Sequence, residues 1–148
     1  MSKQTVKVNT GQQAIIDTDV SKIFVWDNRF DNFDFNNGGY DDVNPKGGTV
    51  MGRISATGKI KPLRSDNSDG SQFPIGILNQ TRVIAAGETV NVAVCVAGDV
   101  VADKLVFEKT GDTLDTVVSG KRLRDRIGSD TVGIKLVGGT ELTKTDND

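Results

Sequence analysis

Hydrophobic and polar residues alternate most regularly over residues 89–97, which read TVNVAVCVA. Every second position from Val90 to Val96 is valine, and the positions between them hold asparagine, alanine and cysteine. Successive side chains of a β-strand point to opposite faces, so the valine face of this strand must be buried. The other face is small and suits close packing against a second layer. Gly98 and Asp99 are predicted to turn the chain, and residues 100–107 to form another strand, or a strand and a bend.

Three shorter strands are predicted before this one, at residues 49–54, 59–63 and 73–78. A turn at residues 56–58 joins the first two. A polar loop at residues 64–72 leads to the third, and its Asx, Ser and Gly residues favour turns because they bond nearby backbone or accept positive φ. Within the third strand, Gly76 is predicted to mark a bulge or a close approach of two backbones.

The chain before residue 47 has weaker patterns. Residues 1–20 are polar, and they are either a disordered terminus or an arm that adds a strand to the sheet edge of a partner. Residues 21–26, SKIFVW, predict a short strand that faces either the core or a partner. In residues 27–46 aromatic residues alternate with aspartates, which predicts a long loop or Ω-loop pinned by aromatic anchors.

The chain after residue 107 predicts one short helix within residues 112–128. Asp112 or Asp115 is expected to cap it, and Gly120 is expected to split it. Leu123 and Ile127 lie four positions apart and should share its buried face. Residues 131–137 predict a final strand that ends at a Gly-Gly pair, and the polar tail follows.

Several short motifs lie in a fixed order along the predicted strands: GTVMG (48–52), TGKIKP (57–62), SDGSQ (68–72), GIL (76–78) and VAVCVAGDV (92–100). Together they resemble the core of lambda-type phage head decoration proteins, the cement proteins of tailed-phage capsids, over residues 47–107. The resemblance implies a small, β-tulip-like domain and a homotrimer at local three-fold positions of the shell. It also implies an N-terminal segment that is flexible when free and ordered on the capsid.

Composition agrees with a single small domain that carries an arm. Only 36% of the 148 residues are hydrophobic, so the core should be thin, and small β-domains often complete their burial by forming oligomers. The net charge of −2 is too weak to track a phosphate backbone by charge alone. No signal peptide and no membrane-length apolar run is present, which predicts a soluble protein made in the host cytoplasm.

Few residues offer catalytic or metal-binding chemistry. The absence of histidine removes Ser-His and Cys-His nucleophiles and the usual zinc sites. Cys95 is the single cysteine, and its apolar neighbours predict a structural role. Asp34, Asn36 and Gly38 imitate the start of a calcium loop, but Pro45 stands where a bidentate Glu is needed. We therefore expect no catalytic residue, no metal and no cofactor.

The complete prediction is a mainly β protein in three parts. Residues 1–46 form an N-terminal arm and an aromatic–acidic loop, residues 47–137 a compact β decoration domain with one short helix, and residues 138–148 a polar tail. Its expected function is structural: as a trimer it binds the outer surface of the expanded phage head, through the major capsid protein, and stabilises it. No nucleic acid and no membrane is expected as a partner. The expected capsid contacts are Thr5, Val6, Val8, Ile15, Ile16, Ile23, Phe24, Val25 and Trp26, and a possible further interface is Phe30, Phe33, Phe35 and Tyr40.

Two alternatives come from other functional classes. One is a small β-barrel that binds single-stranded nucleic acid through its aromatics and the basic cluster, which is Lys121, Arg122, Arg124 and Arg126. The other is a trimeric enzyme that acts on a nucleotide or sugar with Asp, Arg and Ser or Thr from several subunits. The basic cluster itself is either a solvated helix face or a contact with an acidic partner.

Overall fold

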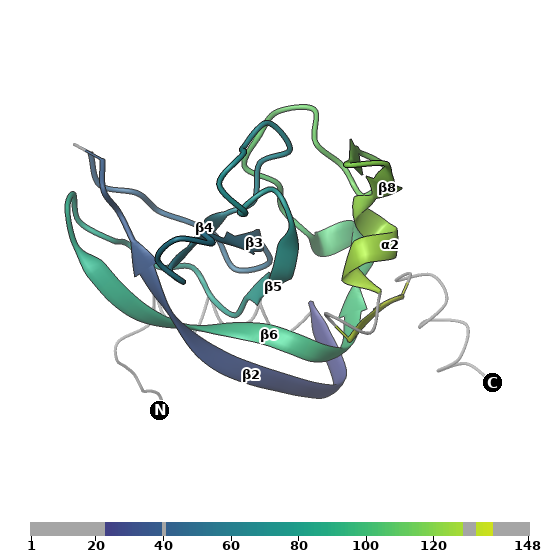
Figure 1. The fold of residues 1–148 in the computed structure, drawn as a ribbon. Helices are drawn as coiled ribbons and strands as arrows, with labels where there is room; N and C mark the ends of the chain where they lie inside the picture. The colour runs from purple at the N-terminus through teal and green to yellow at the C-terminus, as the bar shows by residue number, and fades with distance from the viewer. Residues whose placement is uncertain (1–22, 40, 129–132, 138–148) are drawn as a thin grey trace, which may run out of the picture.

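Two long antiparallel strands carry the rest of the molecule (Figure 1). The computed structural model describes residues 23–39, 41–128 and 133–137. In it β2 (Phe24–Asn36) pairs with β6 (Thr89–Val101), and each strand is 13 residues long. The pairing runs from Phe24 opposite Val100 to Asn36 opposite Thr89, so nearly the whole of both strands takes part. These strands form the long curved ribbon below β3, β4 and β5 in Figure 1.

Three short strands close this ribbon into a small barrel-like sheet. They are β3 (Val50–Arg53), β4 (Ile60–Pro62) and β5 (Pro74–Leu78), and the order around the sheet is β2-β4-β3-β5-β6, with β6 paired back to β2. The seam between β2 and β4 is a single parallel pair, Phe35 with Ile60. On the other edge of β6, β5 pairs near Cys95 and β9 (Ile134–Val137) pairs in parallel further along.

The remaining elements lie beyond β6 in the sequence. A 3-10 turn, η1 (Ala102–Lys104), follows the strand directly. A hairpin of β7 (Val117–Val118) and β8 (Lys121–Arg122) leads into the short helix α2 (Leu123–Ile127). Within the described ranges, no helix has the length and apolar character needed to span a bilayer.

The sheet separates two groups of buried side chains. The barrel core is Phe35, Met51, Ile60, Leu78, Ile84, Val92 and Val94. The helix-side core is Ile23, Val50, Leu63, Ile77, Cys95, Val100, Val118, Leu123, Ile127 and Ile134. Alternation in β6 explains the division, because Val92 and Val94 face the first group while Cys95 between Val94 and Val96 faces the second. The prediction of a buried valine face is therefore confirmed for Val92 and Val94, while Val90 and Val96 are half-buried. On the opposite face Cys95 is packed in the helix-side core and Asn91 is exposed.

The three short strands predicted over residues 49–78 are also confirmed, as β3, β4 and β5. Gly76 lies where predicted, at a close backbone approach: a Cβ there would collide with the carbonyl oxygen of Cys95. The ladder between β3 and β5 shifts register at this point, since Met51 pairs with Gly76 and Gly52 with Pro74. A side chain at Gly76 would push β5 away from β6.

The prediction of a loop over residues 27–46 is wrong for its first ten residues. They continue β2, which begins at Phe24, within the strand predicted at residues 21–26. Aspartate and asparagine are poor strand formers, but pairing with β6 decides the conformation here. Phe33 and Phe35 lie opposite Val92 and Val90, and Asp34 accepts a hydrogen bond from the Asn91 amide at 3.2 Å.

The turn predicted at Gly98 and Asp99 is wrong as well, because β6 runs straight through both residues. Gly98 has φ +102, and a Cβ on it would lie 2.6 Å from the carbonyl oxygen of Asp27. The glycine therefore marks a bulge between two paired strands, where the opposite backbone comes unusually close.

The predicted helix within residues 112–128 is reduced to its last five residues. The β-branched pair Val117–Val118 forms a hairpin strand instead, and Gly120, at φ +80, turns the chain. Neither predicted cap is correct: the N-cap residue is Arg122, which makes no side-chain capping bond. The buried face is confirmed, because Leu123 and Ile127 are fully buried. The predicted last strand is confirmed as β9, and the tail after it lies outside the described residues.

Gly52 provides a test of how tightly this sheet is packed. A Cβ at Gly52 would collide with the Ser71 carbonyl oxygen and lie 2.7 Å from its Cα. We expect Gly52→Ala to lower the free energy of unfolding by about 3 kcal/mol or more, at or beyond the usual cost of overpacking. Gly38→Ala is the control, because nothing lies within 4 Å of a Cβ there. It should change stability by less than about 1 kcal/mol in the same urea titration. Equal effects of the two substitutions would contradict the packing.

Candidate interaction surfaces

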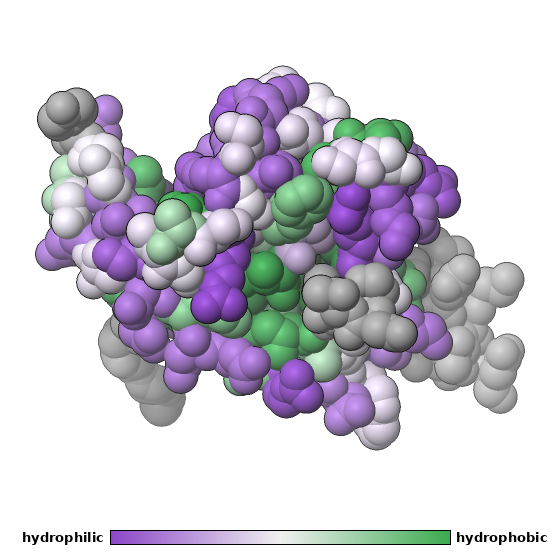
Figure 2. Space-filling view, in the orientation of Figure 1, coloured by the Kyte–Doolittle hydropathy of each residue, from purple (hydrophilic) through white to green (hydrophobic). Residues whose placement is uncertain are grey.

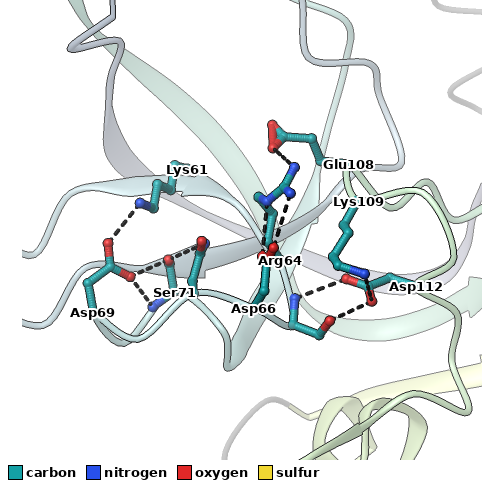
Figure 3. Close-up of polar contacts among 10 residues, drawn as sticks. Lys61, Arg64, Asp66, Asp69, Ser71, Glu108, Lys109 and Asp112 are labelled. Atoms are coloured by element: carbon teal, nitrogen blue, oxygen red, sulfur yellow. Dashed lines mark hydrogen bonds and ion pairs between the residues drawn. The ribbon is translucent and has the colours of Figure 1, made fainter.

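The polar loop at residues 64–72 is held firmly against β3. Gly70 has φ +105, and a Cβ there would lie 2.8 Å from the carbonyl oxygen of Arg53. The next residue, Ser71, is fully buried. Its hydroxyl donates to the Asp69 carboxylate and accepts a hydrogen bond of 2.8 Å from the Asn67 amide (Figure 3). The Asp-Gly-Ser sequence is thus required for a loop that packs tightly on its neighbouring strand.

Ion pairs tie this loop to its surroundings. Lys61 Nζ lies 2.7 Å from Asp69 Oδ2, and this contact, with the hydrogen bonds from Ser71, holds the pKa of Asp69 far below its usual range. Arg64 pairs with Asp66 at 3.1 Å and with Glu108 at 3.2 Å, which raises the pKa of Arg64. The carboxylates of Asp66, Asp69 and Glu108 are thus already paired with cations on this face (Figure 3).

Asp112 fixes the same loop from the other side. Its carboxylate is almost completely buried and accepts hydrogen bonds from the Ser65 backbone N–H, at 2.9 Å, and from the Ser65 hydroxyl, at 2.6 Å. Lys109 Nζ lies 3.9 Å from it. This cross-link joins two segments 47 positions apart in the sequence. It explains why Asp112 is buried here and does not cap a helix.

A second surface is the bulge in β2 around Trp26. The register with β6 shifts three times between Phe24 and Phe30, and Asp27 has φ +53. The Asn28 amide holds the bulge by donating to the Asp99 carbonyl oxygen at 3.0 Å and contacting Cys95 Sγ at 3.6 Å. At the outside of the bulge, the side chain of Trp26 is 72% exposed. The bulge thus presents a large aromatic side chain to solvent.

The structure distributes the predicted contact residues between core and surface. Ile23 is buried in the helix-side core, and Phe24 packs edge-on against the Phe30 ring with centroids 5.2 Å apart. The exposed members are Val25, Trp26 and Phe30, which we call the Trp26 patch. Phe33 is partly buried and Phe35 is buried in the barrel core. The other predicted contacts lie outside the described residues; they are Thr5, Val6, Val8, Ile15, Ile16 and Tyr40.

An apolar cavity that was not predicted lies at the other end of β2. Its volume is about 350 Å³, and four separate segments contribute to its walls. We call it the β2-end cavity; its apolar lining is Phe35, Val43, Pro45, Pro62, Val106 and Phe107. Only folding brings these segments together, so no local sequence pattern could have predicted the cavity.

Apolar surface is also uncovered on the face shown in Figure 2. A hydrophobic area lies over β5 and β6, between β4 and α2, with hydrophilic side chains around it. Large contiguous apolar patches are rare on the surface of monomeric proteins, and they commonly mark interaction sites.

Comparison with known families identifies the family of the chain. The family model of the bacteriophage lambda head decoration protein D matches residues 39–123, more than half of the chain. The chain belongs to this family. The resemblance inferred from the motifs in residues 47–107 is thereby confirmed, and so is the mainly β fold with one short helix. No curated protein matches the chain significantly.

Membership of this family assigns the protein a general role in the phage head. The family consists of structural proteins of the phage head, so the chain is a capsid decoration protein associated with the virion. The matched region contains β3 to β6, the polar loop, the hairpin and the first residue of α2. It begins after β2, so the Trp26 patch lies in the part of this decoration protein that the family model does not match.

The basic cluster of this decoration protein is engaged in internal contacts. Arg122 lies 3.2 Å from Asp125, and Arg124 lies 3.0 Å from Asp115. The guanidinium of Arg126 donates to the Val118 carbonyl oxygen at 2.6 Å and stacks over the Phe73 ring at 4.8 Å. Much of the charge that suggested a nucleic-acid surface is balanced by these neighbours, and Arg126 stabilises the joint between the hairpin and β5.

Cys95 is buried, as predicted, and its burial raises the pKa of the thiol. The thiol donates to the Ala97 carbonyl oxygen at 3.1 Å. Among the residues that the structure describes, no group of three or more His, Cys, Asp or Glu side chains is placed to hold a metal ion. The surfaces of this decoration protein are thus built from ion-paired loops and apolar patches.

The ion pair of Asp69 predicts a specific pH dependence. Because its folded-state pKa is depressed, its contribution to stability is present above the unfolded pKa, near 4, and is lost as the pH falls through the folded value. We expect Asp69→Asn to lower the free energy of unfolding by about 1 kcal/mol at pH 7, a modest value because the side chain is partly exposed. The difference from wild type should stay constant down to about pH 5 and shrink below about pH 4.

The matched control is Asp103→Asn, which makes the same charge change at an exposed aspartate with no ion pair in the described structure. Urea denaturation at several pH values measures both variants. A deficit of Asp69→Asn that persists undiminished at strongly acidic pH would show that the carboxylate charge is not its cause.

Proposed function

We propose that this decoration protein binds the outer surface of the expanded head as a homotrimer and stabilises the shell. The observation that carries the proposal is the family match over residues 39–123. The partner is the major capsid protein, the protein is synthesised in the host cytoplasm, and its action requires no catalytic step, metal or cofactor. In the predicted division residues 1–46 supply capsid contacts, residues 47–137 form the decoration domain and residues 138–148 are a tail. We now assign β2 (Phe24–Asn36) to the decoration domain, because it pairs with β6.

Cementing stabilises the shell through the thermodynamic linkage between binding and assembly. A protein that binds the expanded shell and not its disassembled parts stabilises the shell by mass action, by about 2.7 kcal/mol per site at a hundredfold excess over Kd. In a trimer each subunit contacts the shell, so the second and third contacts form at the effective concentration set by the first. Weak single contacts then add up to tight binding.

The contacts proposed for the shell come from the beginning of the chain. An arm that includes Thr5, Val6, Val8, Ile15 and Ile16 would add a strand to a sheet edge of the capsid protein, with its backbone supplying affinity and its alternating side chains the register. Val25 is exposed at the start of β2, a few residues after this arm in the sequence, and is assigned to the shell as well. Ile23 belongs to the helix-side core, so its contribution is to anchor the base of the arm.

Removing the arm tests this assignment. We expect a chain without residues 1–20 to fold, because the buried residue Ile23 and all of β2 remain. It should nevertheless fail to co-sediment with expanded shells. The control is a chain without residues 141–148, which should bind normally. If the arm-less chain occupied shells at normal levels, the arm would have no role in binding.

Stabilisation is tested separately from binding. Purified expanded shells should melt at a higher temperature as the protein is added, and the rise should continue logarithmically beyond saturation, as mass action requires. Calorimetry of shells at several protein concentrations measures it. Bound protein that leaves the melting temperature of the shells unchanged would decorate the head without cementing it.

A further inference from the structure

Trp26 is arranged as an anchor for an interface. It is 72% exposed, and its neighbours in the Trp26 patch, Val25 and Phe30, are 38% and 40% exposed. Tryptophan is among the residues that dominate binding energy at interfaces. The bulge also fixes its backbone through the Asn28 hydrogen bonds, so little backbone entropy would be lost when the indole is bound.

The β2-end cavity is built to receive an apolar group. Its volume of about 350 Å³ lies in the range of small-ligand sites, which accommodates a bicyclic ring. Its walls are fixed by the fold. Phe35 closes the barrel by pairing with Ile60, Val43 bridges to Ile84, and the Val106 N–H donates to the Gly48 carbonyl oxygen at 2.9 Å. The cavity therefore exists before anything binds.

Anchor and cavity lie too far apart to meet within one chain. Nine residues of β2 separate Trp26 from Phe35, a span of up to about 30 Å at 3.3 Å per residue. Two complementary surfaces at separate places on a subunit form a heterologous contact between copies, and such contacts generate closed rings when the rotation between copies permits. This layout favours a second copy of the chain as the occupant.

Charges beside the two surfaces are complementary as well. The rim of the β2-end cavity carries Lys46 and Glu108, and Glu108 is already paired with Arg64 at 3.2 Å. The remaining charges are those of Lys46 and of Asp27, which follows Trp26 directly. Within the described part of the chain, neither makes an ion pair. A copy whose indole entered the cavity would bring its carboxylate toward this ammonium, and such rim pairs contribute to orientation and specificity.

We propose that the indole of Trp26 from one copy occupies the β2-end cavity of the next copy, so that copies join head to tail into a closed ring. The inference rests on the self-association part of the proposed function, and it is independent of shell binding. At every contact in the ring, one subunit supplies its Trp26 patch and the next supplies its β2-end cavity.

The chain is suited to a direct test because Trp26 is its only tryptophan. As the concentration of the full-length protein rises, tryptophan emission should shift to shorter wavelength together with the rise in sedimentation coefficient. Trp26→Ala should weaken self-association at least about thirtyfold, the effect of losing a binding hot spot. Val106→Glu, at a cavity wall outside both cores, should do the same and leave the emission red-shifted at every concentration. Unfolding curves of both variants confirm that they fold.

Mixing the two variants is the decisive experiment. Trp26→Ala retains the cavity and Val106→Glu retains the anchor, so a head-to-tail contact predicts one-to-one heterodimers with blue-shifted emission from two proteins that are monomeric alone. A charge exchange is the matched test of orientation: Asp27→Lys and Lys46→Glu should each weaken association, and the double variant should recover it.

Several results would overturn the inference. They are a wild-type protein that stays monomeric at the highest attainable concentration, an oligomer whose tryptophan stays red-shifted, and a mixture that does not form heterodimers. A blue shift that Val106→Glu shows only when shells are added would assign Trp26 to the capsid protein instead. Shell co-sedimentation reports on the proposed function separately, since a ring with buried Trp26 that fails to bind shells would refute capsid binding and leave the ring intact.

Discussion

The antiparallel pairing of β2 with β6 is the constraint on which the other features depend. It supplies one continuous wall of the barrel, and β6 presents its two faces to two different cores. On its other edge β6 recruits β5 and then β9. The bulge at Gly98 and Asp27 is a local interruption of the same pairing, so the exposure of Trp26 is a consequence of how these two strands fit.

Around this ribbon, polar side chains hold the loops in place. Asp69, Asp112 and Arg126 each connect segments that contribute no regular ladder to one another. The loops of the decoration domain are therefore defined surfaces and can present a fixed shape to a shell or to another copy. A rigid surface loses less entropy on association than a mobile one, which suits a capsid decoration protein.

The sequence predicted those parts of the fold where local pattern and tertiary environment agree. The valines of β6, the short strands β3 to β5 and the pair Leu123 and Ile127 have the period of the element they form. It failed where distant pairing decides, as in β2, whose aspartates and asparagines favour a loop until β6 is beside them. The Trp26 patch was included among the predicted contacts, whereas the β2-end cavity was missed because its walls come from four segments.

Pairing over such distances also affects how the chain is made. Pairs between β2 and β6 join residues from 53 positions apart (Asn36 with Thr89) to 76 positions apart (Phe24 with Val100), so β2 leaves the ribosome well before its partner exists. During that interval its edges are unpaired, and a strand rich in phenylalanine would readily aggregate. Asp27, Asp31 and Asp34 are spaced along it, and charges placed this way act as gatekeepers of nascent strands. The same aspartates that made residues 27–36 resemble a loop in the sequence are thus placed to oppose aggregation of the nascent chain until β6 is synthesised.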